Sequence, residues 1–345
     1  MKIKDFEIGI GPTYIIAELS ANHNQSFERA EQIVRRASET GVDAIKLQTY
    51  TPDTITLESD KDFFKVSKGT LWEGRTLYDL YKEAYTPWEW QPKLKGLAED
   101  LGMACFSSPF DYTSVDFLEK MEVPAYKIAS AELVDLPLIE YVCKTKKPVI
   151  MSTGMASLTE IERAVHTAIK SGCKELALLK CTSAYPAPAE EMNLRTLQDL
   201  ASRFNLPVGL SDHTLGLTSA VVSVALGASI IEKHFTLDRK EGGPDAAFSL
   251  EPAEMKALVE AVRTTEKSMG TVSYEVTEKE KLNRPFRRSL FAVEDIEKGE
   301  RMTEKNFRSI RPAQGIAPRF LSEIMGKKAR VRIEKGTPLE WDFFE

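Results

Sequence analysis

The sequence predicts an α/β chain in which a (β/α)8 barrel, also called a TIM barrel, is followed by a small C-terminal domain. Eight short runs of apolar and β-branched residues alternate with amphipathic stretches of helical length, a pattern that favours a parallel sheet covered by helices. The first strand-helix turn lacks the Gly-x-Gly-x-x-Gly motif, and an open doubly wound sheet needs no eighth strand. We therefore assign residues 1–270 to the barrel, 271–285 to a linker and 286–345 to the small domain.

The predicted strands share short length, β-branched residues and polar residues at their ends. They are residues 14–21, 44–50, 104–110, 125–130, 148–154, 176–183, 207–213 and 229–235. Helical patterns lie between them, for example at 26–40, 157–171 and 193–204, and each of these three begins with Ser or Asn at a plausible N-cap. Residues 51–85 exceed a normal strand-helix connection, and we expect them to form a long loop on the active face.

Composition limits the class of protein. The chain has 345 residues, 42% of them hydrophobic, and its net charge of -6 is spread along the sequence, which argues against a nucleic-acid-binding face. The N-terminus lacks the apolar core of a signal peptide, and the apolar stretch at 220–231 is too short to span a bilayer. We expect a cytoplasmic protein without membrane contact, in which the four cysteines are reduced core residues.

Polar residues at the carboxyl ends of the predicted strands are the main functional signal, because barrel enzymes place their chemistry at that face. The strand ends carry, in order, Glu18 with Asn22 and His23, Lys46 with Gln48, Ser107 with Ser108, Lys127 with Ser130 and Glu132, Ser152 with Thr153, Thr182 with Ser183, Asp212 with His213, and Glu232 with His234. A single polar strand end is commonplace. Eight on one rim, with two lysines and two histidines, predict a shared site for an anion and a metal.

The histidines at the last two strand ends, His213 and His234, have two interpretations. Imidazoles at matching ends of neighbouring strands can hold one divalent metal, which would polarise a substrate carbonyl. Alternatively, each is a structural residue that is hydrogen-bonded at a strand end. No short motif such as HExxH joins them.

Two lysines, Lys46 and Lys127, stand inside otherwise apolar runs. Burying a lysine is costly unless it faces an anion or reacts as a nucleophile. Because Ser and Thr hydroxyls are near both, binding of phosphate or carboxylate is the simpler interpretation. A Schiff-base lysine is the competing one.

The C-terminal region contains an internal repeat. Ile296-Glu297-Lys298-Gly299 recurs as Ile333-Glu334-Lys335-Gly336, and the same spacing relates Met302 to Leu339 and Phe307 to Phe344. Two copies of a short unit, each with a glycine at its expected turn, indicate a compact, pseudo-symmetric module. From the residues alone, Arg311 in the loop between the copies is either a solvated surface arginine or a ligand clamp.

The chain closely resembles the sialic acid synthase family over the barrel and the C-terminal module. The motifs that carry the resemblance are residues 17–24 (AELSANHN), 45–49 (IKLQT), 106–110 (FSSPF), 126–132 (YKIASAE), 152–155 (STGM), 181–186 (CTSAYP), 209–214 (GLSDHT) and 243–245 (GPD). Within the family, the Glu-Leu-Ser-Ala-Asn-His opening and residues 48–57 are most similar to the branch that forms pseudaminic acid.

The resemblance implies a metal-dependent condensation of phosphoenolpyruvate with an acetamido sugar, with release of phosphate. For the pseudaminic branch the sugar would be 2,4-diacetamido-2,4,6-trideoxy-L-altrose, whereas N-acetylneuraminate or legionaminate synthases use a manno-configured sugar. The metal would be manganese, magnesium or cobalt. The C-terminal part resembles the family's antifreeze-like (SAF) module, which caps the barrel of the partner subunit in a domain-swapped homodimer.

Position by position, the resemblance implies roles for individual residues. His213 and His234 match metal ligands, and Glu18 and Glu132 are the candidate proton carriers. Those matching phosphoenolpyruvate-binding positions are Lys46, Ser108, Lys127, Ser130, Ser152, Ser183, Ser211 and Asp245, and those on the sugar side are Glu18, Gln48, Tyr185 and Arg311. Two departures from the family pattern are Ser183, where the sialic acid branch often has Asn, and Gln25, which replaces a frequent Gly.

The sequence also leaves open two other functions, a different class of enzyme and a non-catalytic binding protein. A metal-dependent aldolase or lyase acting on pyruvate would use a similar strand-end site but release no phosphate. A non-catalytic protein that binds ice or carbohydrate through its C-terminal module would not need the lysines, histidines and carboxylates that the strand ends retain.

Overall fold

The computed structural model describes residues 1–66 and 68–345. The chain divides into two compact units, Met1–Gly270 and Thr271–Glu345, and each is described by itself. Among the described residues, no helix combines the length and apolar character needed to cross a bilayer.

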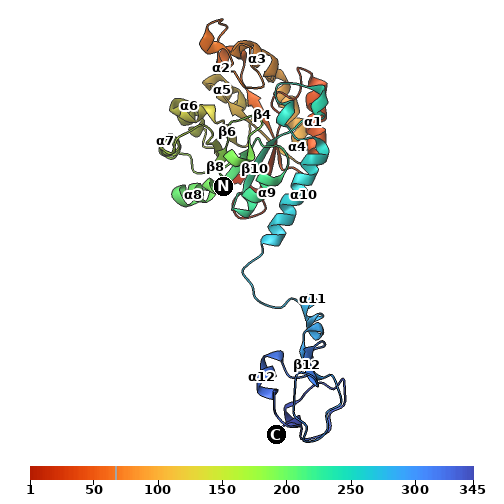
Figure 1. The fold of residues 1–345 in the computed structure, drawn as a ribbon. Helices are drawn as coiled ribbons and strands as arrows, with labels where there is room; N and C mark the ends of the chain where they lie inside the picture. The colour runs from red at the N-terminus through yellow and green to blue at the C-terminus, as the bar shows by residue number, and fades with distance from the viewer. Residues whose placement is uncertain (67) are drawn as a thin grey trace. The chain divides into compact units, whose positions relative to one another are not determined.

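The first unit is a closed barrel of eight parallel strands, which confirms the predicted fold class (Figure 1). The strands are β3 (Tyr14–Glu18), β4 (Ala44–Thr49), β5 (Ala104–Pro109), β6 (Tyr126–Ile128), β7 (Val149–Ser152), β8 (Leu176–Cys181), β9 (Val208–Asp212) and β10 (Ile230–His234). They neighbour one another in sequence order, and β10 pairs with β3 to close the barrel. Because every strand is parallel, all carboxyl ends meet at one face.

A helix follows each strand and covers the outside of the barrel (Figure 1). These helices are α1 (Phe27–Ser38), α4 (Gln91–Asp100), α5 (Tyr112–Lys120), α6 (Leu136–Cys143), α7 (Leu158–Lys170), α8 (Thr196–Phe204), α9 (Thr218–Ala225) and α10 (Pro252–Met269). Ser26 and Ser157 are N-caps as predicted, and their hydroxyls accept from Arg29 N and Glu160 N. The third predicted cap, Asn193, is wrong: its φ is 44°, and α8 begins three residues later.

The segment at 51–85 differs from the predicted loop. It contains α2 (Pro52–Ile55), a 3-10 turn at Asp62–Phe64 and α3 (Leu77–Ala84). Thr51 and Thr76 cap the two helices by accepting from Thr54 N and Asp79 N. The sequence analysis missed both helices, although these caps are local signals that mark their first residues. We call this segment the β4 insertion.

A hairpin of β1 (Lys2–Ile3) and β2 (Phe6–Glu7) precedes the barrel. Ile3 and Ile8 are buried in the main core, and the ring of Phe6 packs edge-on against Tyr14 at 4.7 Å between centroids. The sequence analysis did not predict this hairpin, because two-residue strands carry too short an alternation to be recognised.

The second unit has its own hydrophobic core. Its elements are α11 (Glu278–Lys281), β11 (Ser289–Ala292), β12 (Phe307–Ile310) and α12 (Leu321–Ile324). The repeat copies pair with each other: Ile296 N donates to Ile333 O at 2.8 Å, and Ile333 N donates to Ile296 O at 2.9 Å. Gly299 and Gly336 have φ of 83° and 88°, so each turn uses the left-handed conformation that glycine tolerates.

Candidate functional site

The carboxyl ends of the strands enclose a polar cavity of about 190 Å³, which we call the lysine pocket. Lys46 and Lys127 reach it from β4 and β6 and are almost fully buried. The predicted residues that also line it are Gln48, Ser108, Ser130, Glu132, Ser152, Ser183, Tyr185, Ser211, His213 and His234. Side chains two apart on a strand face the same side, which places Lys46 with Gln48 and Glu232 with His234.

Carboxylates hold both lysines in place. Lys46 Nζ lies 2.5 Å from Glu18 Oε2, and the Nζ atoms of Lys46 and Lys127 each lie 3.8 Å from Glu232 Oε1. Burial favours the neutral amine of Lys46, but Glu18 and Glu232 outweigh it and raise its pKa. Burial lowers the pKa of Lys127 despite Glu232. Both lysine side chains reach the same small cavity, one from β4 and one from β6. This arrangement suits the binding of a phosphate or carboxylate.

Serine hydroxyls surround the lysines. Lys127 Nζ donates to Ser152 Oγ at 2.5 Å, and Lys46 Nζ donates to Ser108 Oγ at 3.4 Å. Gly154 N donates to Ser130 Oγ at 3.2 Å. A Cβ at residue 154 would lie 2.3 Å from Ser183 Oγ, so glycine is required for this close approach.

The rings of His213 and His234 lie 5.4 Å apart between centroids. His213 Nδ1 donates to Thr182 O at 3.0 Å, so in the neutral ring its Nε2 is the acceptor nitrogen. His234 Nδ1 is buried without a hydrogen-bond partner, and burial, followed by the charges of His213 and the lysines, holds the pKa of His234 far below its usual value. A buried, neutral imidazole without a hydrogen-bond partner fits a metal ligand better than a structural histidine.

Among residues 1–66 and 68–345, no group of three or more His, Cys, Asp and Glu side chains is arranged to hold a metal ion. The protein would thus supply two imidazoles, and the remaining ligands would be oxygens of water or substrate. Phe248 packs 4.9 Å from the His234 ring and Tyr185 packs 4.5 Å from the His213 ring. These contacts fix the orientation of both imidazoles.

Glu132 lies at the rim of the lysine pocket, just after β6. Burial raises its pKa to about 7, and its Oε2 is buried without a hydrogen-bond partner. No cation of the described chain lies within ion-pair distance of it. A carboxyl with a pKa near neutrality can both take and return a proton during one catalytic cycle.

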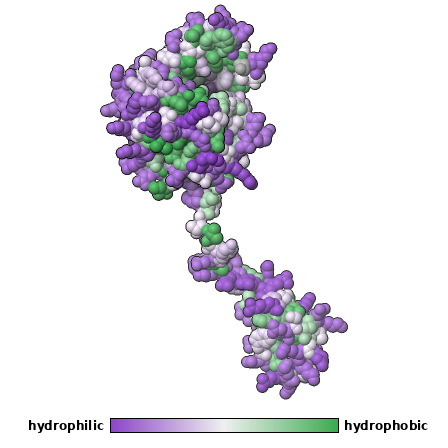
Figure 2. Space-filling view, turned by 90° about the vertical axis from the view of Figure 1, so that its left-hand side faces the viewer, coloured by the Kyte–Doolittle hydropathy of each residue, from purple (hydrophilic) through white to green (hydrophobic). Residues whose placement is uncertain are grey.

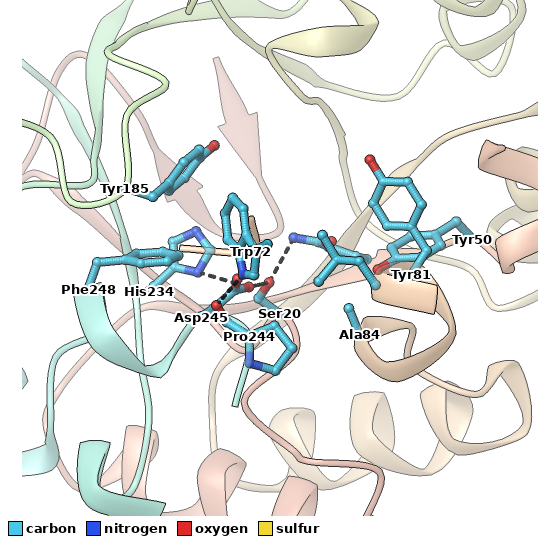
Figure 3. Close-up of a pocket in the computed structure, with 12 residues that line it drawn as sticks. Ser20, Tyr50, Trp72, Tyr81, Ala84, Tyr185, His234, Pro244, Asp245 and Phe248 are labelled. Atoms are coloured by element: carbon cyan, nitrogen blue, oxygen red, sulfur yellow. Dashed lines mark hydrogen bonds and ion pairs between the residues drawn. The ribbon is translucent and has the colours of Figure 1, made fainter. Parts of the chain in front are cut away.

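A second cavity of about 260 Å³ adjoins the first, and we call it the aromatic pocket (Figure 3). Gln48, Tyr185 and His234 line both cavities. Gln48 Nε2 donates to Glu18 Oε1 and to Ser20 Oγ, each at 3.0 Å. Ser20 in turn donates to Asp245, whose Oδ2 lies 3.8 Å from His234 Nδ1. Asp245 therefore lines the aromatic pocket, and its predicted contact with phosphoenolpyruvate stays a prediction.

The β4 insertion forms part of the aromatic pocket. Trp72 Nε1 donates to Pro244 O at 2.8 Å, and the Trp72 ring lies 5.6 Å from that of Tyr185. Gln25, at φ 56°, donates from Nε2 to Glu83 O and Tyr85 O at 2.9 and 2.7 Å. The residue that replaces the frequent glycine thus ties the end of the insertion to the loop after β3.

Several site residues were missing from the predicted set. Glu232 had been noted as a strand end but given no role, although its alternation with His234 places it on the inner face. Cys181, assigned to the core, lines the lysine pocket 3.8 Å from His213 Nδ1. Ser20, Tyr50 and Trp72 carried no signal, because their approach depends on loop conformation. Arg311 belongs to the second unit and is exposed there.

Family models, sequence relatives and a solved structure all relate this chain to synthases of nine-carbon sugar acids. Residues 33–274 match the NeuB family, and residues 287–345 match the SAF domain. The chain is 47% identical to the pseudaminic acid synthase of Campylobacter jejuni subsp. jejuni serotype O:23/36 (strain 81-176), covering 96% of both chains. It is 43% identical to that of Helicobacter pylori (strain ATCC 700392 / 26695), covering 97% of this chain and 98% of the relative. The solved structure of a Leptospira borgpetersenii N-acetylneuraminic acid synthetase, in complex with citrate, superposes with a TM-score of 0.72 at 31% identity, covering 82% of this chain and 94% of that one.

Proposed function

Because the chain belongs to the NeuB family and ends in an SAF domain, we propose that it condenses phosphoenolpyruvate with 2,4-diacetamido-2,4,6-trideoxy-L-altrose. The products would be pseudaminic acid and inorganic phosphate. Relatives named pseudaminic acid synthase, which are 43–47% identical to this chain over nearly its full length, support this choice of sugar. Since phosphoenolpyruvate is an intracellular metabolite, we place the reaction in the cytoplasm.

One observation carries the proposal: a pocket suited to an anion and a pocket suited to a sugar meet at His234. Lys46 and Lys127, with the hydroxyls around them, would bind the phosphate and carboxylate of phosphoenolpyruvate. Gln48 and Tyr185, at the junction, would orient the open-chain sugar. Two reactants held in adjoining pockets meet in a fixed geometry, which lowers the entropic part of the barrier.

His213 and His234 would hold a divalent ion, manganese, magnesium or cobalt. Such an ion, when bound, polarises a carbonyl oxygen. The methylene carbon of phosphoenolpyruvate forms a bond to the aldehyde carbon of the sugar, and the carbonyl π electrons move onto the aldehyde oxygen, which takes up a proton. Water adds to the central carbon that becomes electron-poor and gives up one proton. In the adduct, the bond from this carbon to the phosphate oxygen breaks with its electron pair on phosphate, while the hydroxyl derived from water loses its proton and becomes the keto group. Glu132 would take the proton of the attacking water, because its buried carboxyl has a pKa of about 7 and forms no ion pair among the described residues.

Glu132→Gln is expected to remove a titration from the pH profile. In the wild type, kcat/KM should rise about tenfold per pH unit below pH 7 and level off above it, because a base must be deprotonated and the pKa of Glu132 is about 7. The variant should lose this rising limb and most of its activity. A falling limb through pH 7 that disappears in the variant would instead assign Glu132 as an acid.

The reaction itself is tested by phosphate release. Release should require phosphoenolpyruvate, a divalent metal and the sugar together, and mass and NMR analysis of the product should identify pseudaminic acid. N-acetylmannosamine, the manno-configured alternative suggested by the N-acetylneuraminic acid synthetase likeness, should be turned over poorly. Pyruvate with borohydride should leave Lys46 and Lys127 unmodified, since trapping of either would favour a Schiff-base aldolase.

A homodimer forms part of the proposal. Several apolar residues of 271–286 are exposed in the single chain: Val272 (92%), Tyr274 (98%), Leu282 (76%) and Phe286 (61%). Figure 2 shows hydrophobic residues along the segment between the two units. A second copy of the chain would cover this apolar surface. By the family resemblance, its SAF domain would bring Arg311 to the sugar.

Complementation tests whether Arg311 acts in the partner's site. Arg311→Ala alone should raise the KM for the sugar about 10–100-fold, the effect of losing a charge-assisted hydrogen bond. Co-expression of Arg311→Ala with the barrel-inactive His213→Ala, His234→Ala variant should restore roughly a quarter of wild-type activity, because half of random dimers are mixed and each holds one intact site. An active wild-type monomer, or no recovery in purified mixed dimers, would contradict the exchange.

A further inference from the structure

The junction of the two cavities defines how a sugar must lie in the aromatic pocket. The new carbon-carbon bond forms between a reactant in the lysine pocket and one in the aromatic pocket, so the aldehyde carbon belongs at the shared residues, Gln48, Tyr185 and His234. The other end of the open chain must then extend away from His234. Figure 3 shows what lies there: Tyr50, Tyr81 and Ala84 face His234 and Phe248 across the pocket.

The wall opposite His234, which we call the far wall, consists of Tyr50, Leu80, Tyr81 and Ala84. Leu80 and Ala84 are one turn apart on α3 and therefore lie on the same side of that helix. Tyr50 is itself fixed by edge-on contacts with Tyr81 at 5.6 Å and Phe110 at 5.1 Å between centroids. This rigid surface is made of carbon, apart from two phenol hydroxyls.

Polar groups are concentrated elsewhere in the pocket. Ser20, Gln48 and Asp245 form a connected chain of hydrogen bonds beside His234. The head and middle of a bound sugar can therefore exchange hydrogen bonds with the protein. A hydroxyl on its last carbon would be brought against Leu80 and Ala84, which offer it no partner; on this wall only the phenol hydroxyls of Tyr50 and Tyr81 could bond it.

We propose that the far wall selects a sugar whose terminal carbon is a methyl group over one that ends in a hydroxymethyl group. The inference rests on the proposed function and assigns its selectivity at carbon 6 to Leu80 and Ala84, with Tyr50 and Tyr81 supporting them. A hydrophobic surface rejects an added hydroxyl only moderately, so the expected preference is about 10–100-fold in kcat/KM.

The experiment uses two sugars that differ only at carbon 6, namely 2,4-diacetamido-2,4,6-trideoxy-L-altrose and its 6-hydroxy counterpart. The full-length wild type should prefer the first by the stated factor. Ala84→Ser and Leu80→Asn each place a polar group on the far wall and should move the ratio toward one, without changing the KM for phosphoenolpyruvate. Lys82→Ser, on the exposed side of the same helix, is the matched control and should keep the wild-type ratio.

The outcomes separate the inference from the proposed function. Equal kcat/KM for both sugars in the wild type, or a ratio that neither variant alters, would overturn the role of the far wall while leaving the synthase activity intact. No phosphate release with either sugar would overturn the proposed function, and the inference with it. If Leu80→Asn fails to fold, the smaller change Ala84→Ser decides.

Discussion

The double variant His213→Ala, His234→Ala is expected to lose divalent-metal binding and at least about 10³-fold in phosphate release, because metal polarisation of a carbonyl supplies several kcal/mol of transition-state stabilisation. Both histidines line the lysine pocket, and His234 also lines the aromatic pocket. The Nδ1 atom of His234 is buried without a hydrogen-bond partner. Removing both rings takes away the two imidazoles that line the lysine pocket.

Metal binding should be measured independently of turnover, by the loss of the free Mn²⁺ signal in electron paramagnetic resonance. His166→Ala, an exposed histidine on α7, is the matched control and should bind Mn²⁺ like the wild type. Circular dichroism should show that the double variant keeps its secondary structure. Full activity of the double variant after chelation would refute the metal assignment.

The variant Lys233→Met is expected to lower the free energy of unfolding by about 3–5 kcal/mol, the usual cost of removing one partner from a buried ion pair. Lys233 Nζ lies 2.7 Å from Asp212 Oδ2, and both side chains are 0% exposed. Lys233 Nζ also donates to Thr214 O at 2.5 Å. Methionine would leave the Asp212 carboxylate charged and unpaired inside the protein.

The same pair occupies the strand positions next to the two histidines. Lys233 and Asp212 are register partners on β10 and β9, and alternation turns them outward while His213 and His234 face the pockets. The ion pair therefore fixes the two strand ends that carry the candidate metal ligands. We expect Lys233→Met to weaken Mn²⁺ binding as well as stability.

A second substitution separates charge from packing. Asp212→Asn combined with Lys233→Met removes the unpaired charge and keeps the side-chain oxygen that Thr214 contacts, so most of the lost stability should return.

Urea unfolding can be followed in a Trp341→Phe background, in which the remaining tryptophans, Trp72, Trp88 and Trp90, all report on the barrel unit. Arg36→Met is the control: its ion pair with Glu39 spans 2.7 Å and is 58–60% exposed, so the loss should be at most about 1 kcal/mol. A Lys233→Met variant as stable as the control would contradict the prediction.

The sequence by itself determined the barrel, its strand ends and the repeat of the second unit. These follow from local signals: apolar runs of strand length, helical periodicity between them and glycine-turned copies of one short segment. Because parallel strands all deliver their carboxyl ends to one face, naming the strand ends was enough to place Lys46, Lys127, His213 and His234 together. Strand alternation could also have assigned Glu232 to the site.

Tertiary structure alone decided how those groups are divided between two pockets. Asp245 lines the aromatic pocket, where Ser20 donates to it from a loop 225 residues away in sequence. Trp72 and the far wall reach the site because the β4 insertion folds back until Trp72 bonds Pro244, 172 residues further on. Neither contact leaves a periodic trace in the sequence, since both depend on loop conformations. Local patterns therefore determine which residues stand at the strand ends, and the packing of loops determines which pocket each of them lines.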